Sequence, residues 1–196
     1  MRPIGTIVRL QIQRSTLKTG EKPDRVYDPA PILPVDRLVV SPDGVLGGGG
    51  EVGWLVDVHH RSHPFTKNED GLHGVSVGFT SHYALMRDRF GERITPGCAG
   101  ENILAEADRR LALADPQGGL AVLGQDGREQ VRLRVLQVAH PCRPFTGWAL
   151  QRERGTRVET EVFKSHLQFL DDGMRGFYCV GERAGVVSVG DRLVAL

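Results

Sequence analysis

The chain has 196 residues, 40% apolar and 25% charged, which is enough for one domain with a real core and short for two. Its 25 basic and 24 acidic residues give a net charge of +1, without the basic excess of nucleic-acid-binding proteins, so we expect no nucleic-acid partner. No apolar run reaches the length of a membrane span or a secretory signal, so we expect a cytoplasmic protein with no membrane association.

The first part of the chain predicts strands separated by turns. Apolar and polar residues alternate from 4 to 12, as in a half-buried strand. A polar stretch at 15–34 contains four prolines and predicts a long surface loop. Three short apolar runs predict further strands, at 37–41, 54–58 and 75–79.

Two segments carry the apolar spacing of helices. The first is 80–90, whose apolar residues recur every three or four positions and which ends at Gly91. The second is 156–170, where Thr156 and Glu159 have the spacing of a capping box.

The last part of the chain returns to strands. Residues 130–139 predict a long strand, and its apolar face switches near 135–136, which indicates a β-bulge. Further strands are predicted at 177–180, 186–189 and 192–196. Because no regular β-α-β alternation appears, we expect a mainly β fold with a few helices: a mostly antiparallel barrel with helices at its rim.

Cys142 is the first candidate for chemistry. It stands between two prolines directly after the predicted strand, with His140 and Arg143 close by. A neighbouring cation favours the thiolate, which can ligate a soft metal or carry sulfane sulfur. The alternative is a buried cysteine that packs as a small apolar residue. We expect the other two cysteines, Cys98 and Cys179, to be packing residues; three cysteines without a C-x-x-C pair argue against a disulfide framework.

Histidines are frequent in the polar loop that begins at Asp57. Four of them lie close together: His59, His60, His63 and His73. Loop imidazoles can ligate a metal, transfer protons or bind phosphate. A zinc hydrolase built on this segment is one hypothesis, and the alternative is a set of solvated loop histidines without a shared function.

The loop at 96–102 is rich in glycine. Gly97 and Gly100 would allow successive backbone N–H groups to turn toward one point and bind an anion. Glu101 and Asn102 add polar side chains that suit a heterocycle. The alternative is an ordinary tight loop.

Together and in this order, these segments resemble the MOSC family, named for the C-terminal domain of molybdenum-cofactor sulfurase. The matching segments are 57–60, 96–102, 140–142 and 175–180, the last continuing through 182–185 and 190–191. They lie within 50–196, and the N-terminal strand fits the same domain. The resemblance implies a single MOSC domain over 1–196 with a β-barrel of the pyruvate kinase barrel-like type.

The resemblance also implies a pyranopterin–molybdenum cofactor and a working thiol at Cys142. This thiol would either pass sulfur from a persulfide to molybdenum or ligate molybdenum in an enzyme that reduces N-hydroxylated compounds. The implied cofactor-binding residues are His59, His60, Gly97, Gly100, Glu101, Asn102, Arg143 and Arg175. The enzyme is our first hypothesis, a non-catalytic carrier of the cofactor the second, and the zinc hydrolase the third.

The chain departs from the family pattern around its cysteine. Many members read Pro-Arg-x-Pro-Cys, and in that register Phe145 would take the thiol position; we adopt the register in which Cys142 follows Pro141. Residues 64–72 resemble an insertion. The chain has no ferredoxin-type cysteine cluster and no dinucleotide-binding glycine motif, so we expect a separate electron-donor or sulfur-donor protein. It also lacks the large pyridoxal-phosphate domain of cofactor sulfurases, so we expect no pyridoxal phosphate within this chain.

Overall fold

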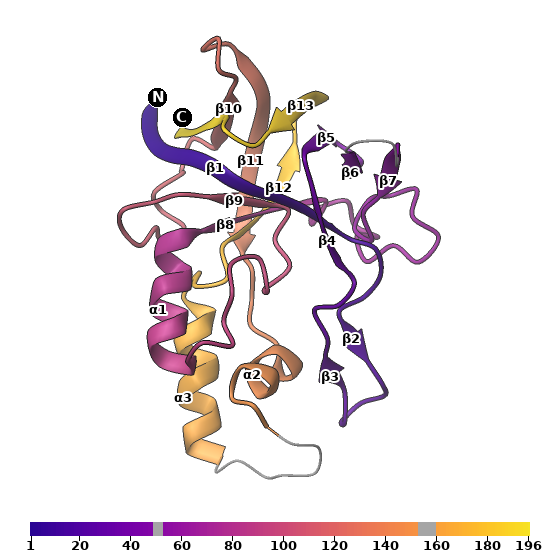
Figure 1. Ribbon diagram of the computed structural model, residues 1–196, viewed down its shortest axis with the longest axis vertical. Coiled ribbons are helices and arrows are strands. Elements are labelled where there is room, and N and C mark those ends of the chain that lie inside the picture. The colour runs from indigo at the N-terminus through magenta and orange to yellow at the C-terminus, as the bar shows by residue number, and fades with distance from the viewer. Residues whose placement is uncertain (49–52, 153–159) are drawn as a thin grey trace.

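Seven strands close into a barrel in the computed structural model, which describes residues 1–48, 53–152 and 160–196. In order around the barrel they are β14 (Arg192–Ala195), β10 (Leu120–Leu123), β11 (Glu129–Val138), β12 (Phe177–Gly181), β8 (Val75–Phe79), β9 (Ile103–Ala105) and β1 (Arg2–Gln13), which pairs again with β14. The β8–β9 pair is parallel and the other barrel pairs are antiparallel. Closure brings the two ends of the chain together, as Figure 1 shows.

Further strands extend from the barrel. A second sheet has the order β13 (Gly185–Ser188), β5 (Arg37–Ser41), β6 (Gly44–Gly48) and β7 (Trp54–Val56). The long strand β1 continues beyond the barrel and pairs there with β4 (Ile32–Val35). Between β1 and β4, a small hairpin is formed by β2 (Lys18–Thr19) and β3 (Val26–Tyr27).

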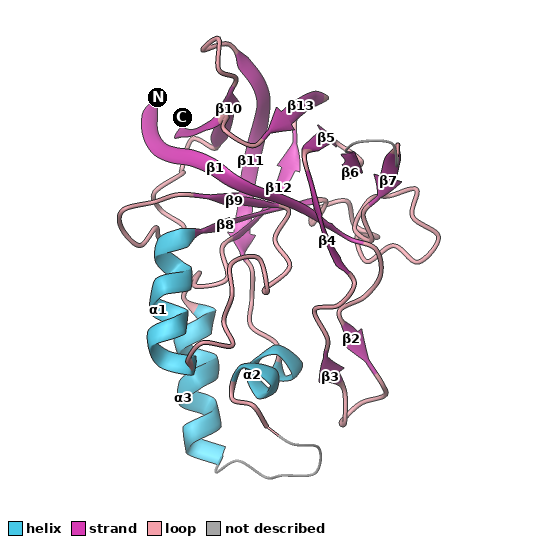
Figure 2. Ribbon diagram, viewed as in Figure 1, coloured by secondary structure: helices cyan, strands magenta, loops and turns pink. Residues whose placement is uncertain are grey.

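Three helices lie at one end of the barrel, as Figure 2 shows. They are α1 (Thr80–Phe90), α2 (Arg143–Ala149) and α3 (Thr160–Asp171). Helix α1 ends at Gly91, whose positive φ of 84° suits glycine. Helices α1 and α3 meet through Phe90, whose ring contacts His166 and Phe169. None of the helices within the described ranges is long and apolar enough to cross a membrane.

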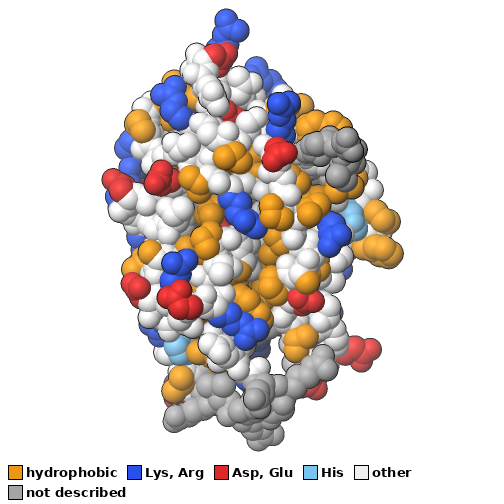
Figure 3. Space-filling view, in the orientation of Figure 1, with side chains coloured by type: hydrophobic (Ala, Val, Ile, Leu, Met, Phe, Trp, Pro, Cys, Tyr) orange, Lys and Arg blue, Asp and Glu red, His pale blue; other side chains and the backbone are white. Residues whose placement is uncertain are grey.

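The apolar core has two parts. One fills the barrel and includes Ile7, Val77, Leu133 and Phe177, all with 0% exposure. The other lies between the barrel end and the helices and includes Met86, Phe145 and Leu170. This second part fixes the helices to the barrel, because burial of apolar surface is the main force that stabilises such packing. On the face in Figure 3, basic and acidic side chains of the described residues are interspersed, in keeping with the net charge of +1.

The predicted mainly β fold, with a barrel and helices at its rim, is confirmed. The strands expected at 37–41 and 75–79 have those bounds, and the bulge is present as a register shift between Val135 and Gln137. The segment 15–34, predicted as a long surface loop, contains β2, β3 and part of β4 and is therefore not a loop throughout. Helix α2 was not predicted. The capping box at Thr156 and Glu159 lies outside the described residues, and the second predicted helix is observed from Thr160.

Candidate functional site

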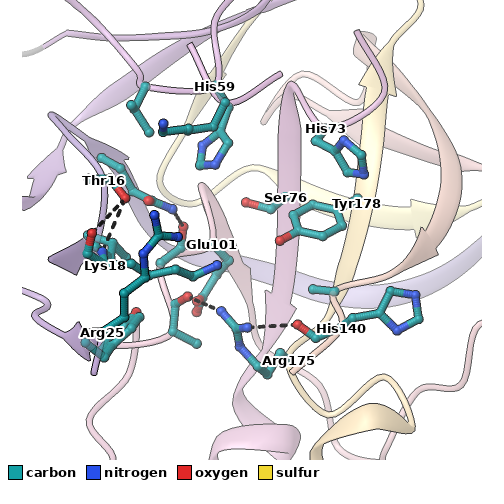
Figure 4. A pocket seen from close by; sticks show the side chains of 18 residues that line it. Thr16, Lys18, Arg25, His59, His73, Ser76, Glu101, His140, Arg175 and Tyr178 are labelled. Atoms are coloured by element: carbon teal, nitrogen blue, oxygen red, sulfur yellow. Dashed lines mark hydrogen bonds between the residues drawn. The ribbon is translucent and has the colours of Figure 1, made fainter. Parts of the chain in front are cut away.

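A pocket of about 410 Å³ opens beside the barrel, where four segments meet. The β2–β3 hairpin forms one wall and the loop that begins at Asp57 forms another. The 96–102 loop supplies the floor, and the region around Ala139 and Arg175 closes the remaining side. Figure 4 shows His59, Glu101 and Arg175 facing this space from three different segments.

The charged residues of the pocket lining are mainly cationic. They include Lys18, Arg25, Lys67 and Arg175, against one carboxyl group, that of Glu101. Lysine and arginine at the rim of a pocket of this size favour a small ligand that carries an anionic group such as phosphate.

Arg175 joins two of the segments named in the sequence analysis. Its guanidinium donates to the carbonyl oxygen of Ala99 at 2.9 Å and to that of His140 at 3.0 Å, and it stacks on the ring of Phe145 at 4.7 Å. Carbonyl groups are neutral, and among the described residues no carboxylate forms an ion pair with Arg175, so its charge stays available at the pocket wall. Burial lowers the pKa of Arg175, but the electrostatic interactions with Cys142 and the nearby tyrosines raise it and leave it above the usual value.

His59 is oriented by a buried carboxylate. Asp57 has 0% exposure, and its Oδ1 accepts from the backbone N–H of His59 at 2.8 Å and contacts ring Nδ1 at 3.0 Å. Its Oδ2 accepts from the backbone N–H of Gln13 at 2.7 Å and from the side-chain amide of Asn102 at 3.1 Å. Such a carboxylate fixes the ring orientation and leaves Nε2 free to meet a ligand.

His60 and Asn102 do not line the pocket. His60 is buried, and its Nδ1 lies 2.7 Å from the hydroxyl of Ser62. The side chain of Asn102 accepts from the backbone N–H and the hydroxyl of Ser76 and donates to Asp57. These contacts hold the walls of the site together.

Most backbone N–H groups of the 96–102 loop form hydrogen bonds within the protein. The backbone N–H groups of Cys98, Ala99, Gly100 and Asn102 donate to the protein, at 3.0–3.1 Å. The loop is therefore not preformed as an anion-binding nest at these positions, in contrast to the arrangement considered from the sequence. Gly100 lines the pocket, whereas a Cβ at Gly97 would lie 2.4 Å from Oε1 of Gln11, so Gly97 allows a close internal approach.

Cys142 is half-buried and precedes helix α2 as its N-cap residue. It packs against the second core cluster, beside the pocket rather than in its lining. It interacts electrostatically with Arg175 and Tyr27, which do line the pocket. The site therefore places the thiol next to the cationic wall.

The other two cysteines are poor nucleophiles. Burial raises the pKa of Cys98 to about 12, with a further increase from Glu101, and burial also raises that of Cys179. Both are at most 6% exposed. Phe145, which takes the thiol position in the alternative family register, has 0% exposure and lies under Arg175. Cys142 is thus the accessible thiol among the described residues.

Arg143 points away from this pocket. Its guanidinium lies 5.6 Å from the ring centroid of Phe163, and it borders a separate groove that includes Arg93 and Trp148. Of the residues predicted to bind a cofactor, the structure brings four to the pocket lining: His59, Gly100, Glu101 and Arg175.

Several lining residues were not predicted as site residues. Lys18 and Arg25 come from the hairpin that the sequence analysis treated as a loop, and their positive charges were the only available signal. His73 was noted only as a nearby histidine; its Nε2 lies 2.6 Å from the amide nitrogen of Gln137, and its ring meets that of Tyr178 at 4.9 Å.

The zinc-hydrolase hypothesis lacks a ligand set in the described part of the chain. Over residues 1–48, 53–152 and 160–196, no three histidine, cysteine or acidic side chains gather as metal ligands. The Nδ1 of His59 contacts Asp57, and the Nε2 of His73 contacts Gln137. These two histidines therefore do not face one shared metal position.

The comparison with protein-family models identifies a family, and the comparison with solved structures finds the same fold. The MOSC domain model matches residues 73–194, so segment 57–60 lies outside the match. Solved structures with this fold include the YUAD protein from Bacillus subtilis (TM-score 0.57, 14% identity, 98% of this chain and 96% of that chain). They also include YiiM from Geobacillus stearothermophilus (TM-score 0.55, 20% identity, 97% and 74%) and YiiM from Escherichia coli (TM-score 0.50, 14% identity, 100% and 71%). No curated protein sequence matches the chain. The chain belongs to the MOSC domain family.

Proposed function

We propose that this chain binds a pyranopterin–molybdenum cofactor in the pocket and acts through Cys142. The MOSC family is associated with molybdenum-cofactor binding. The reaction is either sulfur transfer to molybdenum or molybdenum-dependent reduction of N-hydroxylated compounds. The observation that carries the proposal is Arg175, a cation without a carboxylate partner in the described residues, which holds both the 96–102 loop and His140.

The residues of the pocket fit such a cofactor. The lining offers cations for a phosphate group, from Lys18, Arg25 and Arg175. It also contains a buried carboxyl oxygen without a hydrogen-bond partner, Oε1 of Glu101, which suits a heterocycle with N–H groups. When bound, the cofactor supplies the metal that accepts sulfur or carries out the redox chemistry.

The side chains of the pocket would position the bound cofactor and the groups that react with it. Arg175 would stabilise negative charge on a ligand phosphate, and it lies close enough to Cys142 to interact with it electrostatically. Asp57 keeps the imidazole of His59 turned toward the pocket, where it can hold a proton at Nε2. Reducing electrons or sulfur would come from a separate donor protein, in line with the absence of a second redox motif in the sequence.

A carrier of the cofactor is the second candidate. It is favoured by one observation: Cys142 lies beside the pocket and is not part of its lining. A carrier would need the cationic pocket but not the thiol, so the two functions differ in their dependence on Cys142.

The test uses protein produced in a host that makes the cofactor. We expect close to one molybdenum per chain, and mass spectrometry should show Cys142 either persulfidated or protected from a brief iodoacetamide pulse. Cys142→Ser should abolish sulfur transfer or turnover of an N-hydroxylated base. The control is Cys179→Ala, at the buried cysteine of β12 inside the barrel core. Chains that carry molybdenum but work equally well without the thiol would be carriers, and chains without molybdenum would contradict both functions.

A further inference from the structure

The floor of the pocket holds a carboxyl group with a hydrogen bond to only one of its two oxygens. Glu101 is only 3% exposed, and its Oε2 accepts a hydrogen bond from the hydroxyl of Tyr83 at 2.8 Å. Within the described part of the chain, its Oε1 has no hydrogen-bond partner and Glu101 forms no ion pair. A buried polar oxygen without a partner is costly, so a ligand that supplied the missing donor would be bound favourably here.

The surroundings of Glu101 hold it in this position. The Tyr83 hydroxyl also accepts from the backbone N–H of Ala99 at 3.0 Å, which fixes the donor that orients the carboxyl group. On the other side, a Cβ at Gly78 would come within 2.9 Å of Cγ of Glu101. The glycine therefore leaves the space that the glutamate side chain fills. Burial raises the pKa of Glu101, so N–H donors from a ligand would also stabilise its ionised form.

Positive and negative charges lie at different ends of the pocket, so a ligand with unlike ends would bind in one orientation. The cations Lys18, Arg25 and Arg175 border the pocket, whereas the single carboxyl group lies at its floor. A matching ligand has an anion at one end and N–H donors at the other. An adjacent ring N–H and amino group can donate two parallel hydrogen bonds to one carboxylate, which makes the contact selective.

We propose that Glu101 is the specificity determinant of the pocket and binds the 2-amino-4-oxopyrimidine edge of a pterin, while the cationic rim binds its phosphate. This inference rests on the proposed function and deepens it by assigning which end of the ligand meets which wall. Guanine carries the same ring edge as a pterin, whereas hypoxanthine lacks the amino group and adenine lacks both donors. The corresponding nucleoside monophosphates therefore test the subsite without metal or turnover.

The experiment is calorimetric titration of the apoprotein with GMP, IMP and AMP. We expect GMP to bind roughly 10- to 100-fold more tightly than IMP, because a hydrogen bond to a charged group is lost with the amino group. Glu101→Gln should remove most of this preference, since the amide keeps one acceptor oxygen for Tyr83 but loses the second. Glu106→Gln, at an exposed glutamate, should keep the preference.

Three results would overturn the inference: equal affinity for GMP and IMP, no binding of GMP in the millimolar range, or full selectivity in Glu101→Gln. The wild-type comparison of GMP with IMP needs no variant, so the test stands even if Glu101→Gln does not fold. Glu101-dependent selectivity in a chain that never takes up molybdenum would support the subsite and contradict the proposed function. Molybdenum uptake without selectivity would do the reverse.

Discussion

At the scale of single residues, Arg175 links the 96–102 loop to the segment at His140. Its two hydrogen bonds join the carbonyl groups of Ala99 and His140, which are distant in sequence, and its stacking on Phe145 fixes the plane of the guanidinium. A planar, delocalised cation can make all three contacts together, whereas an ammonium group is a compact point charge. The identity of the cation matters here as well as its sign.

We therefore predict that Arg175→Lys loses both stability and anion binding. The free energy of unfolding in urea should fall by about 1–3 kcal/mol, the range for lost hydrogen bonds from a charged donor. Binding of GMP should weaken as well, because an ammonium group cannot hold the two carbonyls and a phosphate in the same geometry. Arg183→Lys, at an exposed arginine with one long contact of 3.4 Å to Glu129, is the matched control and should stay near wild type. Equal stability of the two variants would contradict the role assigned to Arg175.

At the scale of elements, the site depends on how closely strand β8 approaches the 96–102 loop. Gly78 is buried in β8, and its missing side chain leaves room for Glu101. The same strand pairs in parallel with β9, which continues directly from the loop. Packing inside the barrel therefore sets the depth of the pocket floor.

Gly78→Ala should disturb this arrangement. Its Cβ would lie 2.9 Å from Cγ and 3.1 Å from Oε1 of Glu101, so the glutamate or the strand must move. We expect a loss of about 1–3 kcal/mol in the free energy of unfolding, as for other overpacked cores, together with a weaker preference for GMP over IMP. Gly147→Ala in helix α2 is the control: among the described residues its Cβ would meet only Arg152, at 3.9 Å, so the change should be neutral or slightly stabilising. Unchanged selectivity in Gly78→Ala would show that the floor can relax.

At the scale of the whole molecule, the barrel could be predicted because its strands carry local signals. The run at 75–79 is apolar and the segment at 37–41 is short and bounded by turns, and both are observed with those bounds. Helix α2 gave no such signal, since it spans only seven residues and contains Gly147, a poor helix former. It is held instead by tertiary packing of Phe145 and Ala149, which are fully buried.

The site was predictable only in part, because some of its residues are brought to the pocket by strand pairing rather than by a local sequence pattern. Glu101 and Arg175 stood in recognisable motifs, and the structure brings both to the pocket. Lys18 and Arg25 reach it only because β1 and β4 pair and carry the β2–β3 hairpin over the pocket. A contact created by strand pairing far along the chain leaves no periodic pattern in the polar segment that makes it.

Stability of the whole molecule should depend on pH through His82. Its ring is 1% exposed, its Nε2 accepts from the backbone N–H of Leu111 at 2.9 Å, and burial, assisted by Arg110, lowers its pKa from 6.5 to about 4. Between these values the unfolded chain takes up a proton that the folded chain does not, so stability falls as the pH falls through this window and is recovered above about 6.5. The loss should be on the order of 3 kcal/mol, measured by urea unfolding at a series of pH values.

The contribution of His82 can be isolated by substitution. In His82→Gln the amide oxygen can still accept from Leu111 but does not titrate, so the slope of stability between pH 4 and 6.5 should flatten. The pKa of His166 is also lowered, by burial and by Arg89, and adds a slope of the same sign, whereas the raised pKa of Glu101 adds one of the opposite sign. His63→Gln, in the loop outside the barrel, should keep the wild-type slope. An unchanged slope in His82→Gln would mean that His82 is protonated in the folded chain over this pH range. A protonated Nε2 cannot accept from the backbone N–H of Leu111, so that hydrogen bond would then be absent.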